Sequence, residues 1–277
     1  MAWRLGRKKR DLPDGLFMKC AGCEATVFKK EVENQFNVCP ECGYHFRIPA
    51  RRHLEIALDE NSFEELDADI VTKDPLEFSD RMPYKERLER AQKDTGLKDA
   101  IITGRGKIEG RDVVIGAMDD SFIMASMGAV VGEKVVRSAE RALEGRVPLI
   151  LFCAGGGARM HEGMVSLTQM ARTAAAVARL REAGPIYISV LTNPTTAGTL
   201  ASFAFLGDVV LAEPKALIGF TGARVIRETL HTELPPGFQT AEFMLAHGFI
   251  DCIVPRGEMR SRLGRLLDYA ADAVTKG

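Results

Sequence analysis

Residues 148–160 read PLILFCAGGGARM, and this stretch decides the fold class of the larger part of the chain. Its first seven residues are wholly apolar, as is typical of a strand buried on both faces of a sheet. A glycine triplet follows, and an alanine-rich helix is predicted for residues 165–182. Consecutive glycines before a helix let backbone N–H groups face a cavity, where the helix N-terminus adds partial positive charge. The stretch therefore predicts either an oxyanion site or a tight turn without a ligand.

The same order of strand, loop and helix recurs downstream. Strands are predicted for residues 186–191 and 209–212, and a polar loop at residues 192–198 follows the first of them. That loop opens a predicted helix at residues 199–206, so it is expected to form a second wall of the same site. Upstream, an amphipathic helix is predicted for residues 128–143. The alternation predicts an α/β domain.

Four cysteines near the beginning of the chain form the clearest metal-binding motif. Two CxxC pairs, separated by fifteen residues, place Cys20, Cys23, Cys39 and Cys42 where their thiolates can converge on one tetrahedral zinc. Four thiolates leave no open coordination position, so this zinc would be structural. A disulfide pair is the competing chemistry. The basic start of the chain lacks the apolar segment of a secretory signal, which favours the metal.

The composition narrows the class of protein. The chain has 277 residues, of which 46% are hydrophobic, and its 37 Lys and Arg residues nearly balance 38 Asp and Glu residues. A net charge of −1 argues against a protein that coats nucleic acid, although basic residues between positions 4 and 10 keep nucleic acid as a secondary partner. No apolar stretch reaches the length of a membrane span, so we expect no membrane association and a cytoplasmic location.

Two domains are expected. Residues 1–50 would form a zinc ribbon with a basic arm, and residues 51–277 the larger domain, whose first part at 51–100 is a connecting helical stretch. The sequence lacks the GxSxG elbow and the glycine-rich phosphate loop. His161 and Glu162 are the acid–base candidates nearest the glycine triplet, and their default interpretation is a solvated or helix-capping role.

Five motifs occur in a fixed order along the chain. They are the cysteine quartet ending in CPEC at 39–42, SMG at 126–128, GGGARM at 155–160, PKALIGF at 214–220 and LPPGFQ at 234–239. In this set the chain resembles the beta subunits of the acetyl-CoA carboxylase carboxyltransferase, from the zinc motif to the last helix. The cysteine spacing alone is common, whereas the ordered set is highly specific.

The resemblance implies a crotonase-superfamily fold, a spiral of ββα units, behind the four-cysteine zinc ribbon. It implies a half-site enzyme that transfers a carboxyl group from carboxybiotin to acetyl-CoA and gives malonyl-CoA for fatty-acid synthesis. One structural zinc per chain is expected, and biotin enters as a substrate on its carrier. The implied partners are the alpha subunit in an α2β2 tetramer, the biotin carboxyl carrier protein and biotin carboxylase.

The resemblance also assigns residues to the site. Gly156 and Gly157 match the oxyanion hole, which would bind the enolate oxygen of the acetyl group. The biotin ureido nitrogen can act as the base, so no protein base is required. One departure is Ala197, where the family often has glycine, because its methyl group would narrow a close approach to a ligand. The further residues expected to contact substrate are Gly155, Ala158, Arg159, Gly198 and Arg224.

Two other functions compete with this interpretation. A crotonase-type hydratase or isomerase acting alone on an acyl-CoA would need a positioned carboxylate, and Glu162 is its candidate. A nucleic-acid-binding zinc-ribbon protein would use the larger domain as a scaffold, and its binding would weaken steeply with salt.

Overall fold

The computed structural model describes residues 15–275, without the side chains of residues 223, 224, 230 and 272–275. The chain divides into two compact units, residues 1–46 and residues 47–277. The predicted basic arm at residues 4–10 lies outside the described residues. The division falls close to the boundary that we predicted after residue 50.

The first unit is a small hairpin with a short helix. Strands β1 (Phe17–Lys19) and β2 (Thr26–Phe28) pair antiparallel, and α1 (Lys29–Asn34) follows directly. Its buried apolar residues are Val27 and Val32 with Cys20 and Cys39. So small a core cannot supply the stability of a domain, and small units of this kind are normally held by a metal or by disulfides.

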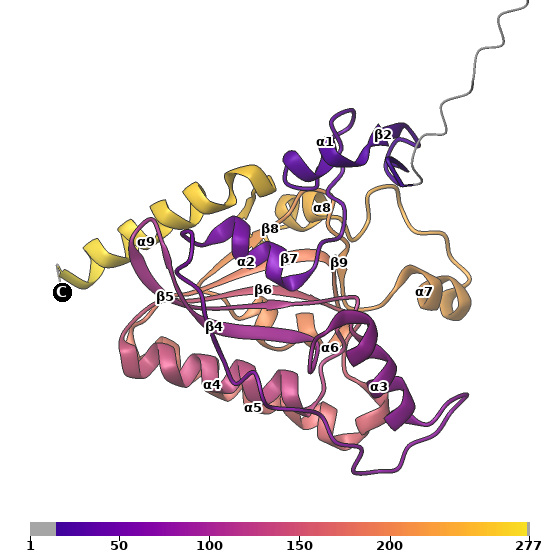
Figure 1. The fold of residues 1–277 in the computed structure, drawn as a ribbon, viewed down its shortest axis with the longest axis horizontal. Helices are drawn as coiled ribbons and strands as arrows, with labels where there is room; N and C mark the ends of the chain where they lie inside the picture. Colours follow the sequence, from indigo (N-terminus) through magenta and orange to yellow (C-terminus); the bar gives the residue numbers. More distant parts are fainter. Residues whose placement is uncertain (1–14, 276–277) are drawn as a thin grey trace, which may run out of the picture. The chain divides into compact units, whose positions relative to one another are not determined.

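The second unit is built on an eight-stranded sheet, drawn in Figure 1. Its strands are β3 (Glu64–Leu66), β4 (Ile101–Ile108), β5 (Arg111–Met118), β6 (Leu149–Gly155), β7 (Tyr187–Thr196), β8 (Val209–Ala212), β9 (Ile218–Gly219) and β10 (Cys252–Ile253). The order along the sheet is β10-β8-β7-β6-β5-β4-β3, and β9 pairs with the end of β7. The pairs β3·β4 and β4·β5 are antiparallel, and every pair from β5 to β10 is parallel.

Helices connect and cover the strands. They are α2 (Ala50–Ala57), α3 (Tyr84–Thr95), α4 (Ala129–Gly145), α5 (Met164–Ala183), α6 (Ala197–Leu200), α7 (Ala223–Leu230), α8 (Ala241–Ala246) and α9 (Met259–Thr275). Figure 1 shows α4 and α5 on one face of the sheet, with α2 and α9 on the other. None of the described helices is both long enough and apolar enough to cross a lipid bilayer.

Most predicted elements are present, with some differences. The strand predicted for 148–154 is β6, and the helices predicted for 128–143 and 165–182 are α4 and α5. The helix predicted for 199–206 is wrong, because α6 ends at Leu200 and a separate 3-10 turn covers Phe203–Phe205. The segment of residues 51–100 is more than a connection, since it contributes strand β3 to the sheet.

The parallel arrangement places several loops at one edge of the sheet. Strands β5, β6, β7 and β8 run in the same direction, so the segments that follow Met118, Gly155, Thr196 and Ala212 all leave from the same edge. Ligand sites of α/β sheets lie at the carboxyl ends of the strands. This edge therefore contains the glycine loop and the junction between β7 and α6. The loop predicted for residues 192–198 is wrong, because residues 192–196 belong to β7 and α6 begins at Ala197.

The close contact between α4 and α5 gives a test of the fold. A Cβ atom at Gly132 of α4 would lie 2.6 Å from the Cβ atom of Gln169 on α5, so Gly132→Ala should force the helices apart. We expect a loss of about 1–3 kcal/mol in the free energy of unfolding, measured by denaturant titration.

Gly145→Ala at the end of the same helix is the matched control. A Cβ atom there meets nothing nearer than 3.4 Å. Alanine is the better helix former by about 1 kcal/mol, so this variant should be neutral or stabilised. Equal effects of the two substitutions would contradict the tight contact between α4 and α5.

Candidate active site

The glycine triplet forms a loop at the carboxyl end of β6. Gly155 and Gly157 have φ angles of 132° and 108°, in a region that favours glycine. A Cβ atom at Gly155 would lie 2.4 Å from the carbonyl oxygen of Ala125, and one at Gly157 would lie 2.7 Å from the Cβ atom of Ala197. Both positions therefore need glycine, because neighbouring atoms pack directly against them.

The backbone N–H groups of this loop differ in whether they already have a hydrogen-bond partner. The N–H of Gly156 donates to the carbonyl oxygen of Met124 at 3.0 Å. Among the described residues, the N–H groups of Gly157 and Ala158 have no hydrogen-bond partner. The prediction that Gly156 donates to an oxyanion is therefore wrong for this structure, since its N–H is already used. Gly157 stays a predicted donor, with the free N–H of Ala158 beside it.

A segment that we call the strap, residues 123–127, lies against the glycine loop. Its first three residues, Ile123, Met124 and Ala125, have φ angles of 46°, 55° and 47°. Each left-handed residue other than glycine costs roughly 1–2 kcal/mol. Besides its bond to Gly156, the strap donates the N–H of Met127 to the carbonyl oxygen of Gly157 at 2.8 Å. This strained turn fixes the shape of the glycine loop.

The junction between β7 and α6 meets the glycine loop, at the place where a second wall of the site was predicted. A Cβ atom at Gly157 would lie 3.4 Å from the backbone nitrogen of Gly198, and one at Gly198 would lie 3.3 Å from that of Ala158. The hydroxyl of Thr196 donates to the carbonyl oxygen of Gly155 at 2.9 Å. Ala197 has a φ of 50°, which glycine would adopt without strain. Its methyl group therefore occupies space beside Gly157, as the sequence suggested.

Arg159 does not lie where we predicted. Its side chain is 0% exposed, and its guanidinium forms a bidentate ion pair with Asp99 at 2.7 and 2.9 Å. It also donates to the hydroxyl of Ser126 at 3.1 Å and to that of Tyr84 at 3.2 Å. Burial alone would lower the pKa of Arg159, but the Asp99 carboxylate raises it well above the usual range. The predicted substrate contact is therefore wrong, because the guanidinium is enclosed and binds the strap.

The two acid–base candidates are also enclosed. The carboxylate of Glu162 accepts hydrogen bonds from the Tyr84 hydroxyl at 2.7 Å and from the N–H of Ala129, the first residue of α4, at 2.6 Å. A capping role is thus confirmed for Glu162, at a helix distant in sequence. The His161 ring stacks on the Tyr84 ring with 4.8 Å between centroids, and the Phe78 ring lies nearly perpendicular to it at 5.3 Å. Burial lowers the pKa of His161, and a solvated role is wrong for both residues.

Arg224, the remaining predicted contact, is the second residue of α7. Its side chain lies outside the described part of the structure, so its role stays a prediction.

The four cysteines of the first unit come together as predicted. Their sulfur atoms all lie within 4.8 Å of one another, with 3.7 Å between Cys20 and Cys42 and 4.0 Å between Cys23 and Cys39. A tetrahedral zinc with Zn–S bonds of about 2.3 Å needs S–S separations of about 3.8 Å. Burial opposes ionisation of Cys20, but N–H groups of Cys23 and Gly22 donate to its sulfur and lower its pKa to about 7. Burial raises the pKa of Cys42 to about 12, so the match to zinc rests on the sulfur positions. The geometry therefore suits a thiolate-bound zinc.

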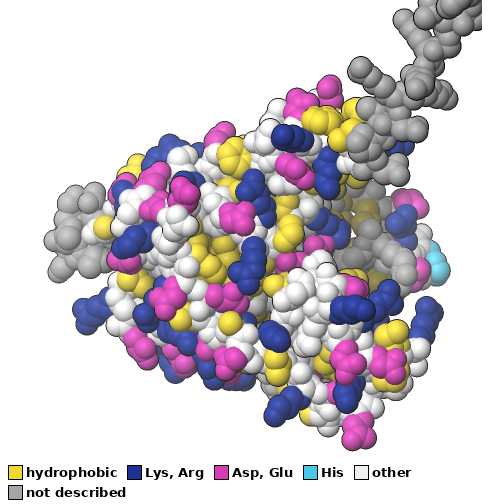
Figure 2. Space-filling view, in the orientation of Figure 1, with side chains coloured by type: hydrophobic (Ala, Val, Ile, Leu, Met, Phe, Trp, Pro, Cys, Tyr) yellow, Lys and Arg dark blue, Asp and Glu magenta, His cyan; other side chains and the backbone are white. Residues whose placement is uncertain are grey.

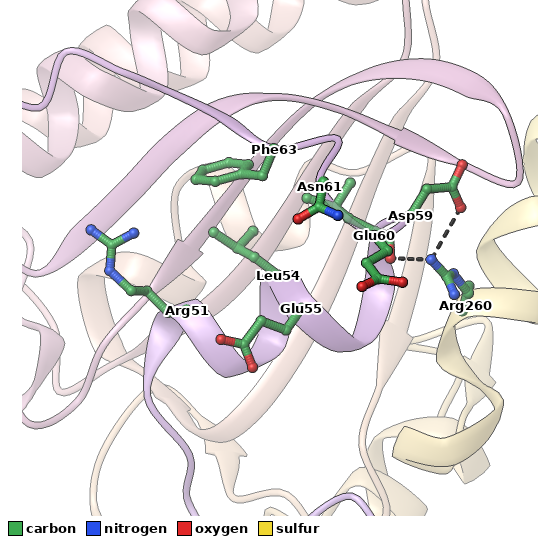
Figure 3. Close-up of a pocket in the computed structure, with 9 residues that line it drawn as sticks. Arg51, Leu54, Glu55, Asp59, Glu60, Asn61, Phe63 and Arg260 are labelled. Atoms are coloured by element: carbon green, nitrogen blue, oxygen red, sulfur yellow. Dashed lines mark hydrogen bonds and ion pairs between the residues drawn. The ribbon is translucent and has the colours of Figure 1, made fainter.

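A cavity of about 410 Å³ lies elsewhere in the second unit, beside α2 (Figure 3). Leu54 and Phe63 give it an apolar wall, and Arg260 reaches Asp59 at 3.0 Å. Its lining residue Leu58 packs over the part of β4 that pairs with the beginning of β5, away from the carboxyl ends of the strands. None of the predicted site residues lines this cavity, so it does not belong to the glycine-loop site.

The buried Arg159 gives a prediction for stability. Removing one partner of a buried ion pair leaves the other charge without compensation, so Arg159→Met should cost about 3–5 kcal/mol in the free energy of unfolding. Arg172→Met is the control, because Arg172 is 46% exposed and its pair with Glu133 faces solvent. We expect less than about 1 kcal/mol there. Equal losses in denaturant titrations would contradict the central role of Arg159.

Comparisons with known proteins agree with the two-part organisation. The carboxyl transferase domain family matches residues 47–235, and the acetyl-CoA carboxylase zinc finger domain family matches residues 17–42. The acetyl-coenzyme A carboxylase carboxyl transferase subunit beta of Desulforamulus reducens is 52% identical over 262 residues, which are 95% of this chain and 90% of that protein. A protein of Natranaerobius thermophilus named as carboxyl transferase subunits beta/alpha is 50% identical over 259 residues, 94% of this chain and 42% of that protein.

Solved structures share the architecture. A transcarboxylase 12S structure with hydrolysed methylmalonyl-coenzyme A bound superposes with a TM-score of 0.68 at 25% identity, over 87% of this chain and 43% of that chain. The fold of the second unit is thus that of carboxyltransferases, and the expected crotonase-like class is confirmed. With family matches over both units and relatives of more than 50% identity along nearly the whole chain, this protein belongs to the family of acetyl-CoA carboxylase carboxyltransferase beta subunits.

Proposed function

We propose that the chain is the acyl-CoA half of a biotin-dependent carboxyltransferase. It transfers a carboxyl group from carboxybiotin to acetyl-CoA and yields malonyl-CoA, the building block of fatty acids. The observation that carries the proposal is the pair of free N–H groups at Gly157 and Ala158, in a loop whose other contacts are fixed. Membership of the family indicates the reaction class. The free N–H groups of the loop are the donors that could stabilise the negative charge formed in that reaction.

The chain's own contribution to the reaction is electrostatic. Loss of a methyl proton turns the acetyl thioester into an enolate, whose oxygen becomes negatively charged. The N–H groups of Gly157 and Ala158 can bind that oxygen, with Gly198 at the facing wall. Because the strap and Arg159 hold the loop in one conformation, the donors need no reorganisation when the charge develops. The biotin of the carrier supplies the carboxyl group and a basic ureido nitrogen.

The stand-alone hydratase is disfavoured by the state of Glu162. Its two carboxylate oxygens are engaged by Tyr84, Arg159 and the first N–H of α4, and the side chain is 1% exposed. A general base must reach the proton that it removes. An enclosed helix cap cannot do so without breaking these contacts, so the carboxyl transfer reaction fits the site better.

A nucleic-acid function is disfavoured by the charge distribution. Figure 2 shows basic and acidic side chains interspersed over the visible face, without a broad area of one sign. Nucleic-acid binding normally uses a basic patch or stripe. Nucleic acid therefore stays a secondary possibility attached to the basic residues 4–10, and the cytoplasm stays the predicted compartment.

We also propose that the half-site is completed by an alpha-type partner. The fused relative, named as subunits beta/alpha, is more than twice as long as the matched region, which supports a requirement for both halves. An α2β2 assembly, served by the biotin carboxyl carrier protein and biotin carboxylase, would bring the carboxybiotin to this edge of the sheet. Zinc would be held by Cys20, Cys23, Cys39 and Cys42, where it stabilises the first unit and takes no part in the reaction.

The direct test uses malonyl-CoA-dependent carboxylation of free biotin. The chain and an alpha-type partner should be active together, and the chain alone inactive. Within the complex, Gly157→Ala should lower kcat by roughly 100-fold, because it displaces the free donors and clashes with Ala197. Gly156→Ala is the matched control and should stay within a few-fold of wild type, since a Cβ atom there meets nothing nearer than 3.8 Å.

Two outcomes would overturn parts of this proposal. Full activity of the chain without a partner would refute the half-site function. Equal effects of the two alanine variants would refute the assignment of Gly157 and Ala158 as oxyanion donors.

The zinc proposal has its own measurement. Metal analysis should find one zinc per wild-type chain and much less in a Cys39→Ser variant, whose first unit should lose protection from amide hydrogen exchange. Cys252→Ser is the control, because Cys252 lies in β10, which belongs to the second unit and not to the unit that contains the four cysteines. Retention of a full equivalent of zinc by Cys39→Ser would show that Cys39 is not a ligand.

A further inference from the structure

His161 lies in a slot between two aromatic rings, close to the glycine loop. It belongs to the 3-10 turn Met160–Glu162, and the residue is only 7% exposed. Its ring is nearly parallel to that of Tyr84, with 13° between the planes, and nearly perpendicular to that of Phe78. The backbone N–H of Tyr84 donates to the carbonyl oxygen of Phe78 at 2.8 Å, which ties the two sides of the slot together. We call His161, Tyr84 and Phe78 the aromatic cluster.

The slot suits an uncharged imidazole ring. The Nδ1 atom of His161 is buried and has no hydrogen-bond partner among the described residues. A protonated imidazole carries an N–H donor on both ring nitrogens, so protonation would bury a charged donor without an acceptor. The neutral ring avoids this cost when Nδ1 is the nitrogen without a proton.

The charged groups around the ring do not compensate for its burial. Arg87 of α3 and Arg159 of the preceding residue disfavour a positive charge on His161, whereas Asp80 and Glu162 favour it. Each of these carboxylates is already paired, Asp80 with Arg87 at 2.9 Å and Glu162 with Arg159 at 3.3 Å. The pKa of His161 is therefore lowered, chiefly by burial and then by Arg87.

Tyr84 connects this histidine to the support of the glycine loop. Its hydroxyl donates to Glu162 at 2.7 Å and accepts from Arg159 at 3.2 Å. Tyr84 is a neutral donor here, because burial raises the pKa of its hydroxyl. Arg159 in turn binds Ser126 of the strap. Displacement of the His161 ring would uncover one face of Tyr84 and loosen this network.

Resting on the proposed function, we propose that His161 is a positioning residue for carboxyl transfer, whose neutral ring keeps the glycine loop in its reactive conformation. It acts through Tyr84 and Arg159 and exchanges no proton with the substrate. Because the pKa of the stacked ring is lowered, a displaced ring binds a proton more readily. The stacked state is thus fully favoured above the ordinary histidine pKa of about 6.5 and loses stability as the pH falls below that value. Carboxyl transfer should fall with it.

The pH profile of carboxyl transfer tests this role. The complex of the full chain with an alpha-type partner is assayed for malonyl-CoA-dependent carboxylation of free biotin at different pH values. His161→Phe keeps a flat ring on Tyr84 and cannot be protonated. The ratio of its kcat at acidic pH, one unit below the ordinary histidine pKa, to its kcat at neutral pH should be roughly two- to fivefold higher than in wild type. The KM for malonyl-CoA should stay the same, because the ring touches no substrate.

A second variant separates the ring from its charge. His161→Ala removes the ring and should lower kcat at every pH, since Tyr84 then loses its stacking partner. His161→Phe should restore most of that kcat at neutral pH, because the aromatic contact returns. Failure of phenylalanine to exceed alanine would contradict a positioning role for the stacked ring.

His247→Phe is the matched control. The His247 ring also stacks on an aromatic side chain, that of Phe243 at 4.0 Å between centroids, but it is exposed at the end of α8. Its variant should keep the pH profile of wild type. Equal changes of the profile in both phenylalanine variants would overturn the assignment to His161.

Amide hydrogen exchange of the full chain gives a readout without turnover. The N–H groups of Gly156 and Met127 join the glycine loop to the strap. After correction for intrinsic exchange rates, they should lose protection in wild type when the pH falls from neutral to acidic. In His161→Phe their protection should stay constant over the same change.

The outcomes separate the histidine from the reaction. A pH profile of His161→Phe equal to that of wild type would overturn the proposal. A raised KM with unchanged kcat would also overturn it, because the ring would then contact the substrate. So would protection of Gly156 and Met127 that does not depend on pH in wild type. If the wild-type complex transfers no carboxyl group, the proposed function fails, while the exchange measurement still decides whether His161 controls the loop.

Discussion

The buried ion pair between Arg159 and Asp99 is the interaction on which the candidate site depends. Both side chains are removed from water, which costs several kcal/mol per charge unless every polar atom is satisfied. The bidentate pair with Asp99 and the hydrogen bonds that Arg159 donates to Ser126, Tyr84 and Glu162 give these buried polar atoms their partners. The pair therefore connects the glycine loop, the strap and the beginnings of α3 and α4. A loop that holds free N–H groups in place needs such a rigid support.

The strained backbone of the strap supports the same site. Three consecutive left-handed residues persist only where surrounding contacts determine the backbone, and the bonds from Gly156 and to Gly157 do so. The strap in turn holds the backbone of the glycine loop on both sides of Gly156.

The two units obtain their stability in different ways. The second unit buries an extended apolar core between its sheet and helices, whereas the first buries only a few residues around its cysteines. A zinc held by four thiolates can contribute roughly 10–16 kcal/mol to a unit of this kind. Its closed coordination leaves the reaction to the glycine loop of the other unit.

The sequence by itself determined most of the elements and the family. Apolar runs such as residues 149–155 specify buried strands by local pattern, and the cysteine spacing and glycine triplet mark their sites directly, because each signal lies within a few residues. Only the tertiary structure decided what each side chain does. Arg159 follows the glycines like a ligand contact, yet Asp99, sixty residues earlier, draws it into the core. Gly156 and Gly157 look alike in sequence, but the strap accepts a hydrogen bond from the N–H of Gly156 and leaves the N–H of Gly157 free. These outcomes depend on contacts between segments far apart in the chain, which no local pattern encodes.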